Sequence, residues 1–396
     1  MKILQINTSV NTGSTGRIAE EIGEVMMQNG FESAIAYGRG NRPSSSKKIK
    51  IGNKLDVYIH VLQTRLLDNH GFASKAATLK LIKEIEAYNP DVIGLHNLHG
   101  YYLHIGVLFD FFKEYNKPLV WTFHDCWPFT GHCAHFDYVG CEKWKTQCIK
   151  CPLTKRYPSS LGFDNSRFNF YRKKSAFNKI ENLTIVTPSQ WLSKKIFESY
   201  LSSFPIKVIH NGIDLNLFKR INLVNEEKII LGVASVWDRI KGLDQFIELR
   251  KILDIEYKIV LVGLNNNQIK NLPEGIVGIR RTNNIQELVK LYNKAAVFIN
   301  PTLVDNFPTV NLEALACGTP VITYNTGGSP EAIDEETGVV VEKGDIKGLK
   351  TAIESMLSRD QTSLSQKCRE RAEKFFDKNE RFNDYLNLYR SLLDGK

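Results

Sequence analysis

The chain has 396 residues, of which 42% are hydrophobic and 24% are charged, and this composition excludes the disordered, collagen-like and coiled-coil classes. At about 150 residues per domain, the length predicts two or three domains. No window approaches 18 consecutive apolar residues and the first residues lack the apolar core of a signal peptide, so we expect a cytoplasmic protein without a transmembrane helix.

The net charge of +9 is confined to the first half of the chain. Residues 1–215 hold 27 Lys and Arg against 18 Asp and Glu, whereas residues 216–396 hold 25 of each kind. The runs at residues 47–50 and 172–174 carry part of the excess. A one-sided basic surface attracts phosphates, nucleic acid or anionic lipid, and solubility is the simpler alternative.

Strand-like apolar runs alternate with helical patterns through the first half. Continuous apolar runs are typical of parallel strands that are covered on both faces. The expected strands lie at residues 2–7, 33–37, 91–95, 119–123, 183–187 and 206–210, with helical patterns such as 18–28 and 79–88 between them. This alternation predicts a doubly wound sheet.

The pattern breaks at residues 211–214, and the polar stretch 215–228 is interpreted as a linker. The alternation then restarts, with strands expected at 229–234, 258–262, 276–279, 297–300 and 320–323. We therefore predict an α/β fold with two Rossmann-like parallel-sheet domains, residues 1–212 and 213–379, that face each other across a cleft. A C-terminal helix, residues 380–396, is expected to cross back to the first domain.

A glycine turn, Gly13-Ser14-Thr15-Gly16, directly follows the first strand. Such a turn at the start of a helix presents free backbone N–H groups to an anion, although an ordinary tight turn explains it equally well. It lacks the full dinucleotide fingerprint, and the second strand leads into Gly38-Arg39 without a carboxylate for a ribose. Both features count against a nicotinamide enzyme.

The most informative segment is residues 300–321, NPTLVDNFPTVNLEALACGTPV. It predicts a strand end, a loop, a helix near residues 309–316 and Gly318 just past the helix. Asp305 lies in the loop and Glu313 lies eight residues later on the helix. A helix N-terminus favours a pyrophosphate, and carboxylates beside it are expected to accept hydrogen bonds from sugar hydroxyls.

These residues resemble the retaining GT-B glycosyltransferases of family 4, also called glycosyl transferases group 1. That family carries an acid, seven intervening residues, a Glu, an Ala-rich helix and Gly-x-Pro-Val, which here is Asp305 to Val321. Further matches are 211–214 (NGID), 327–331 (GGSPE), Lys241-Gly242 and His124, in order along nearly the whole chain.

The resemblance implies a role for each matching residue. Asp305 would bind hydroxyls of the donor sugar, Glu313 would bind the ribose, and Lys241 would neutralise the departing pyrophosphate. His124 would contact the sugar near its C6 end. The other implied donor contacts are Gly13, Gly16, Asn211, Asn306, Phe307, Thr309 and, near the base, Arg280.

Two positions depart from the family pattern. The first acid is usually Glu and here is Asp305, which is one methylene shorter. The family usually has an Arg five residues before the Lys, and that position is Val236. We expect Arg239 to take the place of the missing Arg.

Residues 123–161 fit no strand–helix pair and are rich in Cys, His and aromatic residues. Cys133, Cys141, Cys148 and Cys151 have seven, six and two residues between them, and only the last spacing is a zinc knuckle. A structural zinc site, buried reduced thiols and a disulfide all stay open, with His132 and His135 as alternative metal ligands. A polysaccharide-cluster subgroup of the resembled family carries a similar insert.

The resemblance implies an enzyme that transfers a hexose, with retention, from a nucleotide-diphosphate sugar to a glycan acceptor, without a catalytic metal. UDP is the expected nucleotide, and the expected acceptor is a lipid-linked oligosaccharide of surface polysaccharide synthesis at the inner membrane face. The basic first domain would meet that anionic surface. The alternative is a nucleotide-sugar epimerase or a glycan phosphorylase on the same fold. No motif for nucleic-acid binding is present, so we expect no such partner.

Overall fold

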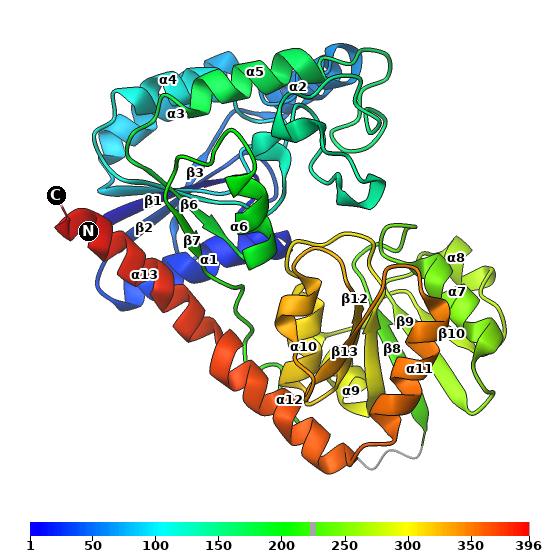
Figure 1. Cartoon of the computed structure of the whole chain (residues 1–396). Helices are drawn as coiled ribbons and strands as arrows, with labels where there is room; N and C mark the ends of the chain where they lie inside the picture. Colours follow the sequence, from blue (N-terminus) through cyan, green and yellow to red (C-terminus); the bar gives the residue numbers. More distant parts are fainter. Residues whose placement is uncertain (222–226, 396) are drawn as a thin grey trace. The chain divides into compact units, whose positions relative to one another are not determined.

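A computed structural model describes residues 1–221 and 227–395 of the chain (Figure 1). The described residues form two compact units. Unit 1 comprises Met1–Ile209 with Phe382–Lys396, and unit 2 comprises His210–Arg381. Part of the linker prediction, residues 222–226, lies outside the described residues. No helix within the described ranges has the length and apolar character that crossing a bilayer requires.

Unit 1 is built on a parallel sheet of seven strands in the order β3-β2-β1-β4-β5-β6-β7. Neighbouring residues of one strand point to opposite faces, so Ile3 and Leu4 enter different cores. The strands are β1 (Lys2–Asn7), β2 (Glu32–Tyr37), β3 (Lys47–Lys50), β4 (Val92–Leu95), β5 (Leu119–Thr122), β6 (Leu183–Thr187) and β7 (Ile206–Val208).

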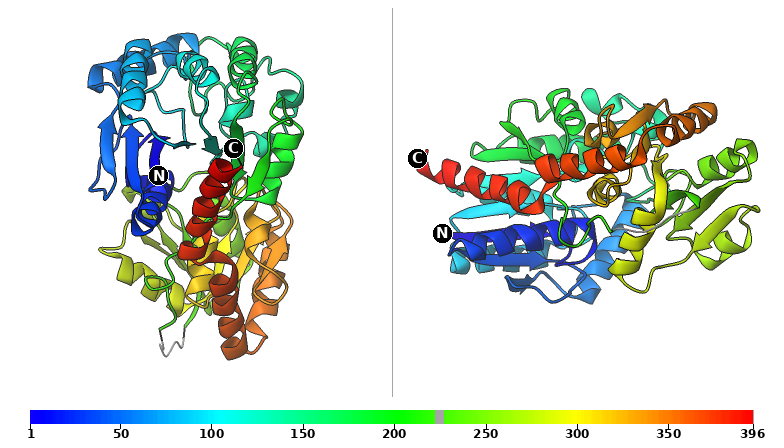
Figure 2. Two further views of the ribbon diagram at one scale, coloured as in Figure 1. Left: turned by 90° about the vertical axis from the view of Figure 1, so that its left-hand side faces the viewer. Right: turned by 90° about the horizontal axis from the view of Figure 1, so that it is seen from below.

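Helices cover both faces of this sheet, which explains the continuous apolar runs (Figures 1 and 2). Helix α13 begins in unit 2 and continues into unit 1, where Tyr385, Leu386 and Tyr389 pack with the strands beside α1. The helices of unit 1 are α1 (Gly13–Gln28), α2 (Lys54–Leu67), α3 (Lys75–Tyr88), α4 (Ile105–Lys113), α5 (Ser166–Phe177), α6 (Gln190–Phe197) and most of α13 (Lys378–Asp394).

Unit 2 has its own parallel sheet of six strands in the order β10-β9-β8-β11-β12-β13, and one continuous apolar core. The strands are β8 (Lys228–Val233), β9 (Tyr257–Val262), β10 (Ile276–Ile279), β11 (Ala295–Asn300), β12 (Val321–Tyr324) and β13 (Gly338–Val341). The helices are α7 (Leu243–Ile252), α8 (Asn266–Lys270), α9 (Ile285–Lys294), α10 (Thr309–Ala316), α11 (Ile346–Leu357) and α12 (Gln361–Phe376).

The strand order positions the site of unit 2. Successive strands β8, β9 and β10 extend the sheet to one side of β8, and β11 starts the other side. Loops that leave such a reversal point diverge, and ligands of doubly wound sheets bind there, at the carboxyl ends of the strands. The loops after β8 and β11 carry Lys241 and Asp305, so the topology brings these two predicted residues to one place.

Two strands were not predicted, β3 and β13. The basic run at residues 47–50 was interpreted as surface charge, but it forms the edge strand β3. Its lysines are exposed and Ile49 is buried, and charged residues are the usual protection of a sheet edge.

The segment between β5 and α5 contains neither an α-helix nor a strand, and every one of its residues is described. Three 3-10 turns interrupt it: Trp127–Phe129, Asp137–Val139 and Lys143–Lys145. Phe129, Phe136 and Trp144 are buried and pack edge to face or stacked, with ring centroids 4.9–6.1 Å apart. They join the core that covers one face of the unit 1 sheet. The insert is therefore anchored by apolar packing against the core of unit 1.

Candidate active site

The loop after β11 and helix α10 form the centre of the predicted donor site. The helix begins at Thr309, directly after Pro308, and ends at Ala316. Gly318 follows with a φ of +79°, the left-handed conformation that favours glycine after a helix. The first turn of any helix has backbone N–H groups without partners inside the helix, and in α10 these follow the loop that carries Asp305.

Lys241 and Asp305 form an ion pair across the two loops at the reversal point. Lys241 Nζ lies 2.6 Å from Asp305 Oδ2. The two side chains are 37% and 22% exposed, so a ligand can reach both of them. The pair places an accessible cation and an accessible anion side by side at the carboxyl edge of the unit 2 sheet.

A close approach of the two loops holds this pair in place. The Leu303 N–H donates to the Ile240 carbonyl at 2.7 Å. Gly242 has a φ of +82°, and a Cβ there would lie 2.4 Å from the Pro301 carbonyl oxygen. Glycine is therefore required next to Lys241, which explains the Lys-Gly pair seen in the sequence.

Glu313 is 9% exposed on α10, and one of its carboxylate oxygens is held by a tyrosine that sequence reasoning missed. The Tyr292 hydroxyl donates to Glu313 Oε2 at 2.8 Å. Burial, and then the charge and hydrogen bond of Glu313, raise the pKa of Tyr292 well above its usual range. Tyr292 therefore stays a neutral donor that fixes the carboxylate.

Buried polar contacts join α10 to the glycine turn after β12. Asn300 Nδ2 donates to Asn311 Oδ1 at 2.9 Å, and Asn311 Nδ2 donates to Ser329 Oγ at 3.2 Å. The Gly328 N–H donates to the Asp305 carbonyl at 3.1 Å. The predicted 327–331 motif thus supports the loop that presents Asp305.

Four of the remaining predicted residues of unit 2 lie in or beside the loop before α10 and the start of this helix. Asn211 Nδ2 donates to the Phe307 carbonyl at 3.2 Å, and the Phe307 ring stacks on His210, so Asn211 and Phe307 do meet. Asn306 is buried beside Phe307, and Thr309 is half-buried at the start of α10.

The two arginines lie apart from these contacts. Arg239 is exposed, and its side chain makes no ion pair within the described ranges, so its predicted role stays a prediction. Arg280 is exposed after the edge strand β10, with β9 and β8 between that strand and β11.

The predicted residues of unit 1 lie at the carboxyl edge of its own sheet. His124 follows β5 and stacks on His96, with His124 Nε2 3.1 Å from His96 Nδ1. Burial is the main cause that lowers the pKa of His124 to about 4, so this imidazole is neutral at pH 7. Gly13 begins α1 with a φ of +69°, and a Cβ at Gly16 would lie 2.9 Å from Ser9 Oγ.

A chain of polar contacts beside His124, in which His99 and Asp125 are buried, was not predicted. His99 Nε2 lies 2.6 Å from Asp125 Oδ2, and His99 Nδ1 lies 2.9 Å from the Tyr157 hydroxyl. Burial alone would raise the pKa of Asp125, but the charge and hydrogen bond of His99 outweigh it and lower the pKa to about 2. The three residues lie far apart in the sequence, so no local pattern could reveal the chain.

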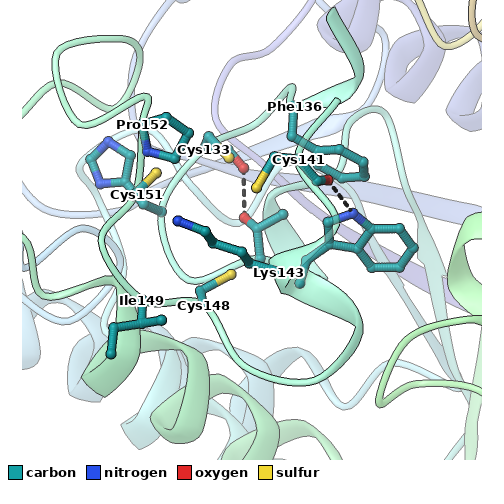
Figure 3. A pocket seen from close by; sticks show the side chains of 11 residues that line it. Cys133, Phe136, Cys141, Lys143, Cys148, Ile149, Cys151 and Pro152 are labelled. Carbon is teal, nitrogen blue, oxygen red and sulfur yellow. Dashed lines mark hydrogen bonds between the residues drawn. The ribbon is translucent and has the colours of Figure 1, made fainter. Parts of the chain in front are cut away.

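The four cysteines line one pocket in the insert (Figure 3). All seven cysteines of the chain lie in the described part, and all are free thiols, so the disulfide interpretation is not supported. The Gly131 N–H donates to Cys148 Sγ at 3.1 Å, and Trp144 Nε1 donates to the Cys141 carbonyl at 2.9 Å. Burial is the main cause that raises the pKa of Cys148 to about 12.

The arrangement of these side chains does not fit a bound zinc ion as it stands. Within residues 1–221 and 227–395, no three His, Cys, Asp or Glu side chains lie where they could hold one metal ion together. The structural zinc at Cys133, Cys141, Cys148 and Cys151 stays a prediction. Metal analysis of protein purified without chelators tests it, with one zinc per chain as the supporting result.

Comparison with protein families matches both halves of the chain. The family described as glycosyltransferase family 4 matches residues 15–217, which is half of the chain. The family described as glycosyl transferases group 1 matches residues 215–375. The second match covers Lys241, Asp305 and Glu313.

Relatives and solved structures agree with these matches. A putative colanic acid biosynthesis glycosyl transferase, WcaC of Escherichia coli K12, is 25% identical over 99% of this chain and its own full length. The capsular polysaccharide biosynthesis glycosyltransferase CapM of Staphylococcus aureus is 27% identical over 53% of this chain and 62% of its own.

The similar structures cover the whole chain. The sucrose-phosphate synthase of Thermosynechococcus elongatus superposes with a TM-score of 0.72 at 19% identity, covering 100% of both chains. HepE of Anabaena in complex with UDP superposes with a TM-score of 0.67 at 15% identity, covering 99% of this chain and 100% of its own. The chain therefore has the GT-B fold and belongs to glycosyltransferase family 4.

Proposed function

We propose that this glycosyltransferase moves a hexose from a nucleotide-diphosphate sugar, with UDP as the nucleotide, to a lipid-linked oligosaccharide acceptor of surface polysaccharide synthesis. The observation that carries the proposal is the accessible Lys241–Asp305 pair, which lies at the reversal point of the unit 2 sheet. The similarity to WcaC and CapM, which are named as colanic acid and capsular polysaccharide biosynthesis glycosyltransferases, supports a role in polysaccharide synthesis. The structures of HepE with UDP and with UDP-glucose support the choice of nucleotide sugar.

The transfer reaction requires the enzyme to stabilise the charge that forms on the leaving group. The bond between the anomeric carbon and the β-phosphate oxygen breaks, and negative charge grows on the departing nucleoside diphosphate. An acceptor hydroxyl forms the new bond to the anomeric carbon and gives up its proton to the departing phosphate oxygen. Lys241 and the first amides of α10 would stabilise the growing charge, an effect that is strong in preorganised sites.

The two carboxylates would orient the donor. Asp305 would accept hydrogen bonds from sugar hydroxyls, and its pairing with Lys241 keeps both groups in position until the donor binds. Glu313, held by Tyr292, would accept hydrogen bonds from the ribose hydroxyls. Retention of the anomeric configuration belongs to this proposal, as do the predicted sugar contact of His124 and the backbone contacts of Asn306 and Phe307.

The comparisons do not favour the alternative epimerase or phosphorylase. A direct test separates them, since an epimerase changes a nucleotide sugar that is incubated without an acceptor, whereas a transferase at most hydrolyses it slowly. Product analysis by NMR of an incubation with UDP-glucose shows which occurs. Rapid conversion to an epimeric sugar nucleotide would overturn the proposal.

A thermal-shift screen of nucleotide sugars tests the donor site itself. A ligand that binds the folded state at 100 times its Kd stabilises the fold by about 2.7 kcal/mol. We expect stabilisation by one nucleotide-diphosphate sugar, and loss of that shift in Glu313→Ala. The matched control is Glu256→Ala, because Glu256 is 53% exposed in the same unit and pairs with Lys228. An equal shift in Glu313→Ala and in the control would contradict the assignment.

A further inference from the structure

Helix α2 of unit 1 has its polar face inside. His60 and Thr64 are 1% and 0% exposed. His60 Nδ1 lies 2.9 Å from Ser74 Oγ, His60 Nε2 accepts from the Gly71 N–H at 3.1 Å, and Thr64 Oγ1 donates to the His60 carbonyl at 2.9 Å. These contacts satisfy the buried polar atoms, which would otherwise destabilise the fold.

The opposite face of α2 is apolar and exposed. Its residues recur at positions i, i+3, i+4, i+7 and i+11, which is one face of a helix. They are Leu55 (63% exposed), Tyr58 (67%), Ile59 (43%), Leu62 (46%) and Leu66 (49%), followed by Leu67 (49%). A surface helix of a globular protein normally has the reverse arrangement, with its apolar face toward the core.

The apolar surface continues beyond the helix. Leu161 is 73% exposed and Phe163 is 60% exposed, in a loop that hydrogen bonds fasten to the end of α2. The Leu161 N–H donates to the Arg65 carbonyl at 2.8 Å, and Asn165 Nδ2 donates to the Leu67 carbonyl at 2.6 Å. We call the six exposed α2 residues with Leu161 and Phe163 the α2 patch. Contiguous exposed apolar surfaces of this kind mark interaction sites.

Basic residues accompany the α2 patch. The segments 54–67 and 155–174 hold eight Lys and Arg against two Asp. Lys54, Arg156, Arg167 and Lys174 are exposed, and α5, which carries the last two, follows the patch loop directly (Figure 1). Leu, Tyr and Phe beside Lys and Arg form the composition of surfaces that lie in a membrane interface.

We propose that the α2 patch docks unit 1 on an anionic lipid bilayer. The apolar side chains would enter the boundary between headgroups and acyl chains, while the cations contact lipid phosphates. A second copy of the chain is a poorer occupant, because a symmetric contact would bring two basic surfaces together. This proposal does not rest on the donor assignment, although docking would bring the enzyme to a lipid-linked acceptor.

Vesicle sedimentation tests the docking. The full chain should bind vesicles of phosphatidylcholine mixed with phosphatidylglycerol more tightly than vesicles of phosphatidylcholine alone, and added salt should weaken the binding. The triple variant Leu62→Gln, Leu66→Gln and Phe163→Gln should bind at least about tenfold more weakly, because each buried apolar side chain contributes about 1.5–3 kcal/mol. The matched control is Ile255→Gln, since Ile255 is 87% exposed in unit 2.

Two double variants test how much the basic residues contribute to vesicle binding. Arg167→Gln with Lys174→Gln should weaken binding about fivefold for each cation removed, at about 1 kcal/mol per charge. Lys343→Gln with Lys347→Gln, two exposed lysines of unit 2, should leave it unchanged. The thermal shift with nucleotide sugar should be the same in all these variants, which confirms folding and separates docking from donor binding.

Three results would overturn the proposal. The first is that the triple variant binds anionic vesicles as tightly as the unaltered chain, and the second is that the unaltered chain does not distinguish the two vesicle types. The third is that light scattering shows a dimer that the triple variant converts to a monomer while vesicle binding stays unchanged, because the α2 patch would then join two copies.

Discussion

The segment from Asn300 to Val321 in unit 2 and the segment from Phe123 to Leu161 in unit 1 both carry chemically informative residues, but the chain organises them differently. The first is a strand, a short loop and a helix, so the sheet topology alone places Asp305 beside Lys241. The second is irregular and is ordered by a buried cluster of Phe129, Phe136 and Trp144.

This difference shows in which segments the spacing of residues along the sequence determines the relative directions of their side chains. In a regular element the rise and turn per residue convert a spacing into a direction. In the insert the spacing of the four cysteines gave no such direction, and the thiols line a pocket without a metal-binding arrangement within the described ranges.

The largest expected effect concerns the aromatic cluster of the insert. Trp144→Ala removes a side chain that is 1% exposed and should lower the free energy of unfolding of unit 1 by about 3–5 kcal/mol. Urea denaturation measures it, with the exposed Phe375→Ala of unit 2 as the control. A loss below about 1 kcal/mol would mean that something other than this cluster, such as a metal, orders the insert.

The next effect concerns catalysis. Lys241→Ala should lower kcat about 100- to 1,000-fold, because the variant lacks the charge that we propose stabilises the departing pyrophosphate. Lys228→Ala is the matched control, since Lys228 forms an exposed ion pair with Glu256 at 2.8 Å in the same unit. Equal kcat values in the two variants would remove Lys241 from the mechanism.

The third effect is a pH dependence in unit 1. The pKa of Asp125 is lowered to about 2, so its ionised form stabilises the fold above about pH 4, and this contribution disappears as the pH falls toward 2. Asp125→Asn should therefore lower the free energy of unfolding by about 2 kcal/mol at pH 7, and the difference from the unaltered chain should shrink below pH 4. Denaturation at a series of pH values checks the sign.

Asp110→Asn is the control for that experiment, because Asp110 is 69% exposed and its nearest cation, Lys179, is 3.9 Å away. It should change stability by less than about 1 kcal/mol at every pH. A difference for Asp125→Asn that grows in acid would contradict the role of the His99 contact.

The smallest expected effect concerns the hydrogen bond that positions the Glu313 carboxylate. Tyr292→Phe removes one hydrogen bond to the carboxylate and should weaken nucleotide binding about tenfold, which is about 1.4 kcal/mol. Titration calorimetry with UDP measures it, with Tyr257→Phe, a buried tyrosine of β9, as the control. An unchanged affinity would show that Glu313 is positioned by its helix alone.

The sequence predicted the regular elements well. The ranges 2–7, 183–187, 276–279 and 309–316 agree with β1, β6, β10 and α10 to the residue. Each range has a single hydrophobicity pattern, and the residues on either side interrupt that pattern. The edge strand β3 was not predicted, because all of its residues except the buried Ile49 are exposed lysines and no apolar pattern is visible.

Contacts between segments that lie far apart in the sequence were not predicted, for a different reason. Tyr292 reaches Glu313 from the preceding helix α9, and Tyr157 reaches His99 from the far end of the insert. The apolar outer face of α2 also required the structure, because its periodicity alone does not say which side faces the core. Such features depend on tertiary packing, which local patterns do not encode.

The measurement that tests the central claim most directly is a crystal structure of the chain with UDP or GDP. We predict the ribose hydroxyls on the Glu313 carboxylate, and the phosphates near Lys241 and the first turn of α10. A nucleotide bound elsewhere, or a carboxyl edge of β8 and β11 that is filled by packed hydrocarbon and excludes it, would contradict the account.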